Sequence, residues 1–189
     1  MKIDLIFGVK IDTIVFSNVL DLKIDIFQHQ HQVNGGKCGI CGDPYDAKIK
    51  DHEAPDGKFA NGIIVREFQS GDIMDVIVEI TANHKGYLVF KLCPNDNVLL
   101  DPLQDCFDKL PLEVYPSHEQ KYDLPDDLER EYQLKLKLPD GLTCNQCILQ
   151  WTYVTGNSWG VGEDGIGCTG CGPQENFRAC SDIRITGCV

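Results

Sequence analysis

The chain has 189 residues, a length that fits one domain, and its 42% hydrophobic and 24% charged side chains are typical of a globular protein. Twenty-nine acidic against 17 basic side chains give a net charge of -12, which argues against nucleic acid or an anionic membrane surface as a partner. No apolar run approaches the roughly 18 residues that a membrane-spanning helix needs, so we expect no membrane partner.

Residues 1–28 are rich in Ile, Val, Leu and Phe, but charged residues interrupt them, and the best uncharged run is residues 13–20. This composition predicts one or two β-strands and lacks the apolar stretch of a secretion signal. A polar segment with His29 and His31 follows, and then the turn signal Asn-Gly-Gly at 34–36.

The remainder of the chain predicts short strands separated by loops. The strongest period-two patterns fall in residues 73–82 and 132–138, and further strands are expected at 63–69, 87–92, 148–154 and 181–186. Gly71 and Asp72 suggest a hairpin-like connection between the first two of these strands in chain order. The glycine-rich stretch 156–172 is expected to be a long loop. Without a convincing helix of about ten residues, this pattern predicts an all-β, antiparallel β-sandwich.

Ten cysteines favour a disulfide framework formed in an oxidising compartment. Three pairs have C-x-x-C spacing (38/41, 144/147 and 168/171), which leaves structural zinc as the alternative. The cysteines at 93, 106, 180 and 188 would be idle in a zinc site and favour disulfides, with Cys93–Cys106 as the expected local pair. At least one thiol is expected to lack a partner, and Cys188 is a candidate.

The usual catalytic motifs are absent or unspecific. No glycine-rich phosphate loop follows a strand, and 29 acidic residues always offer some carboxylate pair. Five histidines remain as candidates. His84 stands where an apolar strand ends in a turn, a position from which an imidazole can project at the end of a sheet, whereas His52 and His118 fall in predicted loops.

Six segments, taken together and in order, resemble one family. The segments are CGICGD at 38–43, ITANHKG at 80–86, KLCPN at 91–95, CNQCILQWTY at 144–153, GNSWG at 156–160 and CGPQENFRACSDI at 171–183. They resemble the animal lytic polysaccharide monooxygenases of auxiliary-activity family fifteen, also called chitin-binding type-4 or spindolin-like domains. The resemblance covers roughly residues 34–185.

The resemblance implies a secreted, immunoglobulin-like or fibronectin-like β-sandwich with long disulfide-bonded loops, which binds one copper ion and oxidatively cleaves chitin or cellulose. In the family, an N-terminal His supplies its amine and imidazole, and a second His completes a brace. His84 matches that second ligand, Phe177 the axial position and Ala82 a small residue near the open axial face. Gln150 and Trp151 match a core strand close to the metal. Cu(II) prefers such tetragonal nitrogen ligands.

Residues 1–32 do not match the family and are expected to form an atypical segment, packed loosely or at an edge, ahead of a domain at 33–189. His29 and His31 are internal, so they lack the free amine and are only substitute ligands; the chain as written is expected to bind copper weakly. The implied partners are a chitin or cellulose surface and an external electron donor, and the expected state is a monomer. Two alternatives remain open: a chitin-binding module without chemistry, and a zinc-stabilised intracellular protein.

Overall fold

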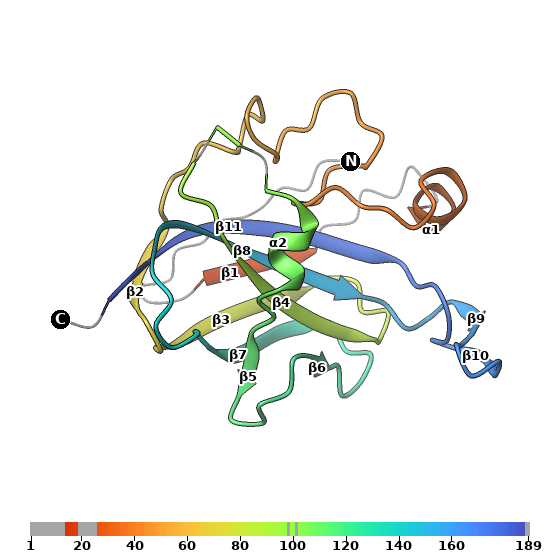
Figure 1. Ribbon diagram of the computed structural model, residues 1–189. Helices are drawn as coiled ribbons and strands as arrows, with labels where there is room; N and C mark the ends of the chain where they lie inside the picture. Colours follow the sequence, from red (N-terminus) through yellow and green to blue (C-terminus); the bar gives the residue numbers. More distant parts are fainter. Residues whose placement is uncertain (1–13, 19–25, 98, 101, 188–189) are drawn as a thin grey trace.

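The computed structural model describes residues 14–18, 26–97, 99–100 and 102–187, which fold into two β-sheets packed face to face (Figure 1). The first sheet has the strand order β1-β3-β7-β5 and the second β2-β11-β8-β4-β6. The first comprises β1 (Ile14–Asn18), β3 (Ile73–Ile80), β7 (Arg130–Lys137) and β5 (Glu113–Tyr115). The second comprises β2 (Arg66–Gln69), β11 (Asn176–Thr186), β8 (Cys144–Val154), β4 (Tyr87–Pro94) and β6 (Tyr122–Asp123).

The remaining elements are small. A two-stranded hairpin is formed by β9 (Trp159–Val161) and β10 (Gly167–Thr169). The helices are α1 (Ile26–Gln28), the π-helical turn η1 (His29–Val33) and α2 (Gln104–Asp108). The all-β sandwich predicted from the sequence is thus confirmed. No helix in the described part of the chain is long and apolar enough to cross a membrane.

Period-two patterning explains the two sheets. In β3 every second side chain from Met74 to Ile80 belongs to the core, and in β7 the core side chains are Tyr132, Leu134 and Leu136. These side chains point at the inner face of the second sheet, where Trp151 and Tyr153 of β8 are at most 1% exposed. One continuous apolar core therefore lies between the sheets and holds them in register.

Strand β1, from the N-terminal segment that was predicted to lie outside the domain, contributes to this core. Strand β1 lies at the edge of the first sheet, where it pairs parallel with β3. Its Ile14 and Phe16 side chains are only 5% and 1% exposed, and the Phe16 ring stacks on Trp151 with centroids 5.8 Å apart. The edge position agrees with the expectation, but burial of these side chains shows that residues 14–18 do not pack loosely.

Three local predictions were wrong. Strands β2 and β3 are not a hairpin, because β2 pairs with β11 in the second sheet and the turn at 70–72 crosses between the layers. The sheets are not wholly antiparallel, since the edge pairs β1/β3 and β2/β11 are parallel. The glycine-rich stretch contains the β9–β10 hairpin. In the first two cases, partners distant in sequence decided the pairing.

Four disulfides join Cys41–Cys180, Cys93–Cys106, Cys144–Cys147 and Cys168–Cys171. The local pair 93–106 is as predicted. The C-x-x-C pair 38/41 is not a unit, because Cys41 bonds Cys180 on β11 and leaves Cys38 as the free cysteine within the described residues. Cys188 lies outside the described residues. Eight thiols bound in disulfides cannot be zinc ligands, which removes the basis of the zinc alternative.

Candidate functional site

His84 lies in the turn that connects β3 of the first sheet with β4 of the second. Lys85 and Gly86 both have positive φ, 58° and 88°. A Cβ atom on Gly86 would lie 2.0 Å from the carbonyl oxygen of Val154, so the close approach of this turn to β8 requires glycine. The Asn83 amide donates to the Leu128 carbonyl (2.8 Å), and its oxygen accepts from the Lys85 N–H (2.8 Å).

The backbone of His84 is fixed on both sides. Its N–H donates to the phenolic oxygen of Tyr153 at 2.7 Å, and its carbonyl accepts from the N–H of Gly156 at 2.9 Å. The imidazole itself is half-buried and makes no hydrogen bond to the residues that the structure describes. His84 is therefore a rigidly placed imidazole whose ring nitrogens are available to a ligand.

A row of buried aromatic rings stands behind this turn. Phe177 on β11 is the register partner of Tyr153 on β8, and their ring centroids are 5.9 Å apart. Trp151, two residues earlier on the same face, stacks on Tyr153 at 6.5 Å. Burial raises the pKa of Tyr153 to about 12, so its hydroxyl is neutral over the physiological range.

Of the site residues predicted from the sequence, four lie in one region of the structure, and the Gln150 side chain lies apart from them. His84, Phe177 and Trp151 are connected through Tyr153, and the half-buried Ala82 lies two residues before His84. The Gln150 side chain points to the opposite face of β8. There its amide donates to the Ile40 carbonyl (2.8 Å) and exchanges hydrogen bonds with Gln104 of α2. Gln150 therefore anchors the loops on the outer face and does not contact this aromatic row.

The two substitute histidines are engaged elsewhere. The Nε2 atom of His29 lies 2.9 Å from a carboxylate oxygen of Asp46. His31 donates its Nε2–H to the Gln174 carbonyl at 2.9 Å, because a carbonyl oxygen only accepts. In neutral His31 this bond leaves Nδ1 as the nitrogen with a lone pair. Helix α1 and the β9–β10 hairpin lie at the same end of the sandwich (Figure 1).

These donors do not complete a copper site. Cu(II) prefers several nitrogen ligands in a tetragonal arrangement. The described ranges of the chain contain no group of three or more His, Cys, Asp or Glu residues able to hold a metal. His84 supplies one imidazole, and Phe177 carries no donor atom. The described residues thus supply one ligand, His84, and the apolar side chain Phe177 expected beside the family's copper ion. They do not supply its full ligand set.

Sequence reasoning missed two residues of this region. Tyr153 is in the quoted segment 144–153 and shares the face of Trp151 two positions before it, so period-two alternation was a signal that pointed to it. Gln174 accepts from His31 and binds the backbone of Ser158 through its side-chain amide. Gln174 lies in the quoted segment 171–183, but no pattern in the sequence singled it out.

Comparison with known proteins identifies the family. A family model described as lytic polysaccharide mono-oxygenase, cellulose-degrading, matches residues 11–183. A solved structure of a lytic polysaccharide monooxygenase of auxiliary-activity family fifteen from Thermobia domestica, in the Cu(I) state, superposes with a TM-score of 0.80 at 40% identity. The match covers 84% of this chain and 82% of that one. No curated protein sequence matches. The chain belongs to the lytic polysaccharide monooxygenases.

Membership gives the general chemistry: copper-dependent oxidative cleavage of polysaccharide, with an external reductant. The family is typically secreted, and the four disulfides agree with an oxidising compartment. The family match begins at residue 11, ahead of residue 33, where the domain was predicted to begin, so part of the segment 1–32 that was expected not to match the family lies within the match.

Proposed function

We propose that this protein cleaves insoluble chitin or cellulose oxidatively at a copper ion held by His84. The observation that supports it is the His84 turn, whose backbone is fixed by Tyr153 and Gly156 while the imidazole makes no hydrogen bond within the described residues. A ligand that is held by its backbone loses little conformational freedom when it binds a metal.

Phe177 is proposed to occupy the axial side of this copper ion. Its side chain is 7% exposed and has no atom able to coordinate, so it would exclude a ligand from that direction. The small side chain of Ala82 is proposed to leave the opposite axial side open. Trp151 supports the arrangement indirectly, because it packs against the ring of Tyr153.

The proposed site needs nitrogen donors beyond those that the described residues supply. His31 is one substitute, but its Nε2 is bonded to the Gln174 carbonyl, so only Nδ1 could bind the metal, and an internal residue has no free amine. We therefore propose that the ligands supplied by the described residues alone bind Cu(II) far more weakly than a complete copper site of the family. A segment that begins with His would supply the two missing nitrogens.

The polysaccharide is proposed to lie across the end of the sandwich next to His84. Trp159, three residues after Gly156, is 69% exposed on the β9–β10 hairpin, and a Cβ on Gly167 would lie 2.7 Å from its ring. The Cys168–Cys171 disulfide links β10 to the turn that follows it. A fixed, exposed indole can pack on the apolar face of a pyranose ring, which suits a flat polysaccharide surface.

A second candidate function is binding of polysaccharide without chemistry. It is favoured by the finding that the described residues supply one unbonded imidazole rather than a metal cluster. The surface around Trp159 does not need copper to bind sugar. The two functions therefore differ in their dependence on His84, which oxidation requires and simple binding does not.

Two measurements on chitin and cellulose test the proposal. Binding to each solid is measured by co-sedimentation, where Trp159→Ala should weaken binding and His84→Ala should leave it unchanged. Oxidised oligosaccharides are measured by mass spectrometry with copper and a reductant present. Binding without oxidised products, even after a His-first segment is supplied, would favour the binding module over the enzyme.

A further inference from the structure

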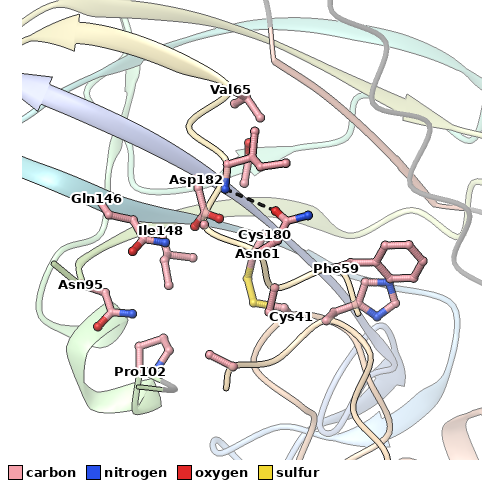
Figure 2. Close-up of a pocket in the computed structure, with 16 residues that line it drawn as sticks. Cys41, Phe59, Asn61, Val65, Asn95, Pro102, Gln146, Ile148, Cys180 and Asp182 are labelled. Carbon is pink, nitrogen blue, oxygen red and sulfur yellow. Dashed lines mark hydrogen bonds between the residues drawn. A yellow bond between two sulfur atoms is a disulfide. The ribbon is translucent and has the colours of Figure 1, made fainter. Parts of the chain in front are cut away.

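A cavity lies away from the proposed copper site, on the outer face of the second sheet. Its volume is about 330 Å³, and the loop through residues 59–65 and strands β8 and β11 contribute to its wall (Figure 2). The apolar wall includes Ile63, Val65 and Ile148, together with the disulfide Cys41–Cys180. A volume in this range accommodates a small organic molecule.

The polar side of the cavity carries one unsatisfied acceptor next to the carboxylate of Asp182. Gln146 is only 7% exposed, its amide is close enough to the Asp182 carboxyl to lower the pKa of that group, and its Oε1 has no hydrogen-bond partner in the described structure. Figure 2 shows the Gln146 and Asp182 side chains beside Ile148. A buried carbonyl oxygen without a donor costs roughly 1 to 3 kcal/mol, and a ligand that donates to it recovers that cost.

The charge of the cavity is also unbalanced. No Lys or Arg is among the residues that line it, and Asp182 forms no ion pair within the described part of the chain. Burial raises the pKa of the Asp182 carboxyl, which is what a carboxylate without a cation partner shows. The other titratable side chain in the wall, His52, has its Nδ1 2.9 Å from Asp43 and stacks on Phe59.

We propose that this cavity binds a small primary amine. Its ammonium group would donate to the Asp182 carboxylate and to Gln146 Oε1, and its apolar body would pack against Ile148, Val65 and Ile63. An ammonium group has three N–H donors and no acceptor, so it satisfies both oxygens and supplies the missing positive charge. Nothing in the proposed copper chemistry uses these residues.

The cavity is separate from the surface around His84. Asp182 is five residues beyond Phe177 on β11, about 17 Å along the strand. The two side chains also point to opposite faces of the sheet, because alternate residues do so. Occupation of the cavity is therefore expected to leave the environment of His84 unchanged.

The test uses 2-phenylethylammonium chloride as the probe and amide chemical shifts of the full chain as the readout. We expect saturable shifts at Ile148, Ser181 and Asp182, and none at His84. The uncharged analogue 2-phenylethanol should bind about tenfold more weakly or worse, since it loses a charge-assisted hydrogen bond. Asp182→Asn, which keeps the acceptor for Gln146, should weaken amine binding by a similar factor.

Two further variants complete the design. Asp127→Asn removes an equal charge from an exposed position and should bind the amine like the parent chain. Ile148→Phe fills the cavity without touching Asp182 and should abolish binding. Absence of saturable shifts at millimolar amine would overturn the proposal, as would equal binding of the alcohol and the amine or unchanged affinity in Asp182→Asn.

Discussion

The phenolic oxygen of Tyr153 lies 2.7 Å from the backbone nitrogen of His84 and accepts its hydrogen bond. Strand β8 thereby fixes the turn that presents the imidazole, and the same tyrosine ring packs against Phe177. Two residues that lie 93 positions apart in the sequence (84 and 177) are joined through this one side chain.

Tyr153→Phe removes the acceptor but keeps the ring. The His84 N–H is then left without a partner, and we expect a loss of about 1 to 3 kcal/mol in the free energy of unfolding. With a His-first segment in place, copper affinity should fall as well, because the imidazole is less firmly held. Denaturant unfolding and calorimetric copper titration measure the two effects.

Tyr122→Phe is the matched control. Tyr122 is half-buried against Tyr132, and its hydroxyl makes no hydrogen bond with the described residues. Its removal should change neither stability nor copper affinity appreciably. If the two substitutions have equal effects, Tyr153 does not position His84.

Alkaline titration should single out Tyr153 among the six tyrosines. Its pKa is raised in the folded state from 10.0 to about 12, so its contribution to stability is complete below pH 10 and is lost as the pH rises through 12. Phenolate absorbance should show one late-titrating group that is missing in Tyr153→Phe. A titration curve identical in parent and variant would contradict the burial argument.

The N-terminal strand is expected to be essential for stability. Phe16→Ala removes a ring that is 1% exposed and stacked on Trp151, which should cost about 3 to 5 kcal/mol. Ile49→Ala, at a side chain that is 79% exposed, should cost little. Equal midpoints of denaturant unfolding for the two variants would show that β1 is not part of the core.

The disulfides should differ in their contribution to stability. Cys41–Cys180 closes a separation of 139 residues and Cys168–Cys171 one of 3. Chain-entropy arguments give about 5 kcal/mol for the first and about 2 kcal/mol for the second. Paired Cys→Ala variants, compared by thermal unfolding, should therefore rank in that order. The opposite ranking would contradict the role given to Cys41–Cys180.

Alternation along single strands predicted most of the fold. Met74 to Ile80 and Tyr132 to Leu136 could be assigned to buried faces because their spacing alone decides which side chains share a face. His84 was predicted as a sheet-end residue for the same reason, since it follows directly after such a strand.

Pairings between distant segments could not be predicted in this way. The Cys41–Cys180 disulfide and the parallel pairing of β2 with β11 each join segments that are far apart in the sequence. The alternation of side chains within one strand carries no information about such partners. The same limit applies to Phe16, because its partner Trp151 is 135 positions away in the sequence (16 to 151). Gln174 acts on His31 through its backbone carbonyl, which any residue possesses.

The measurement that tests the central proposal most directly is mass spectrometry of soluble products from chitin, with copper and a reductant present. Three chains are compared: the 189-residue chain, the chain with its first 32 residues replaced by the corresponding segment of the Thermobia domestica enzyme, and that hybrid with His84→Ala. The replacement must restore an edge strand equivalent to β1, which circular dichroism and thermal unfolding verify. We predict oxidised oligosaccharides from the hybrid alone. Equal yields from all three chains, or none from a folded hybrid that binds copper, would contradict the account.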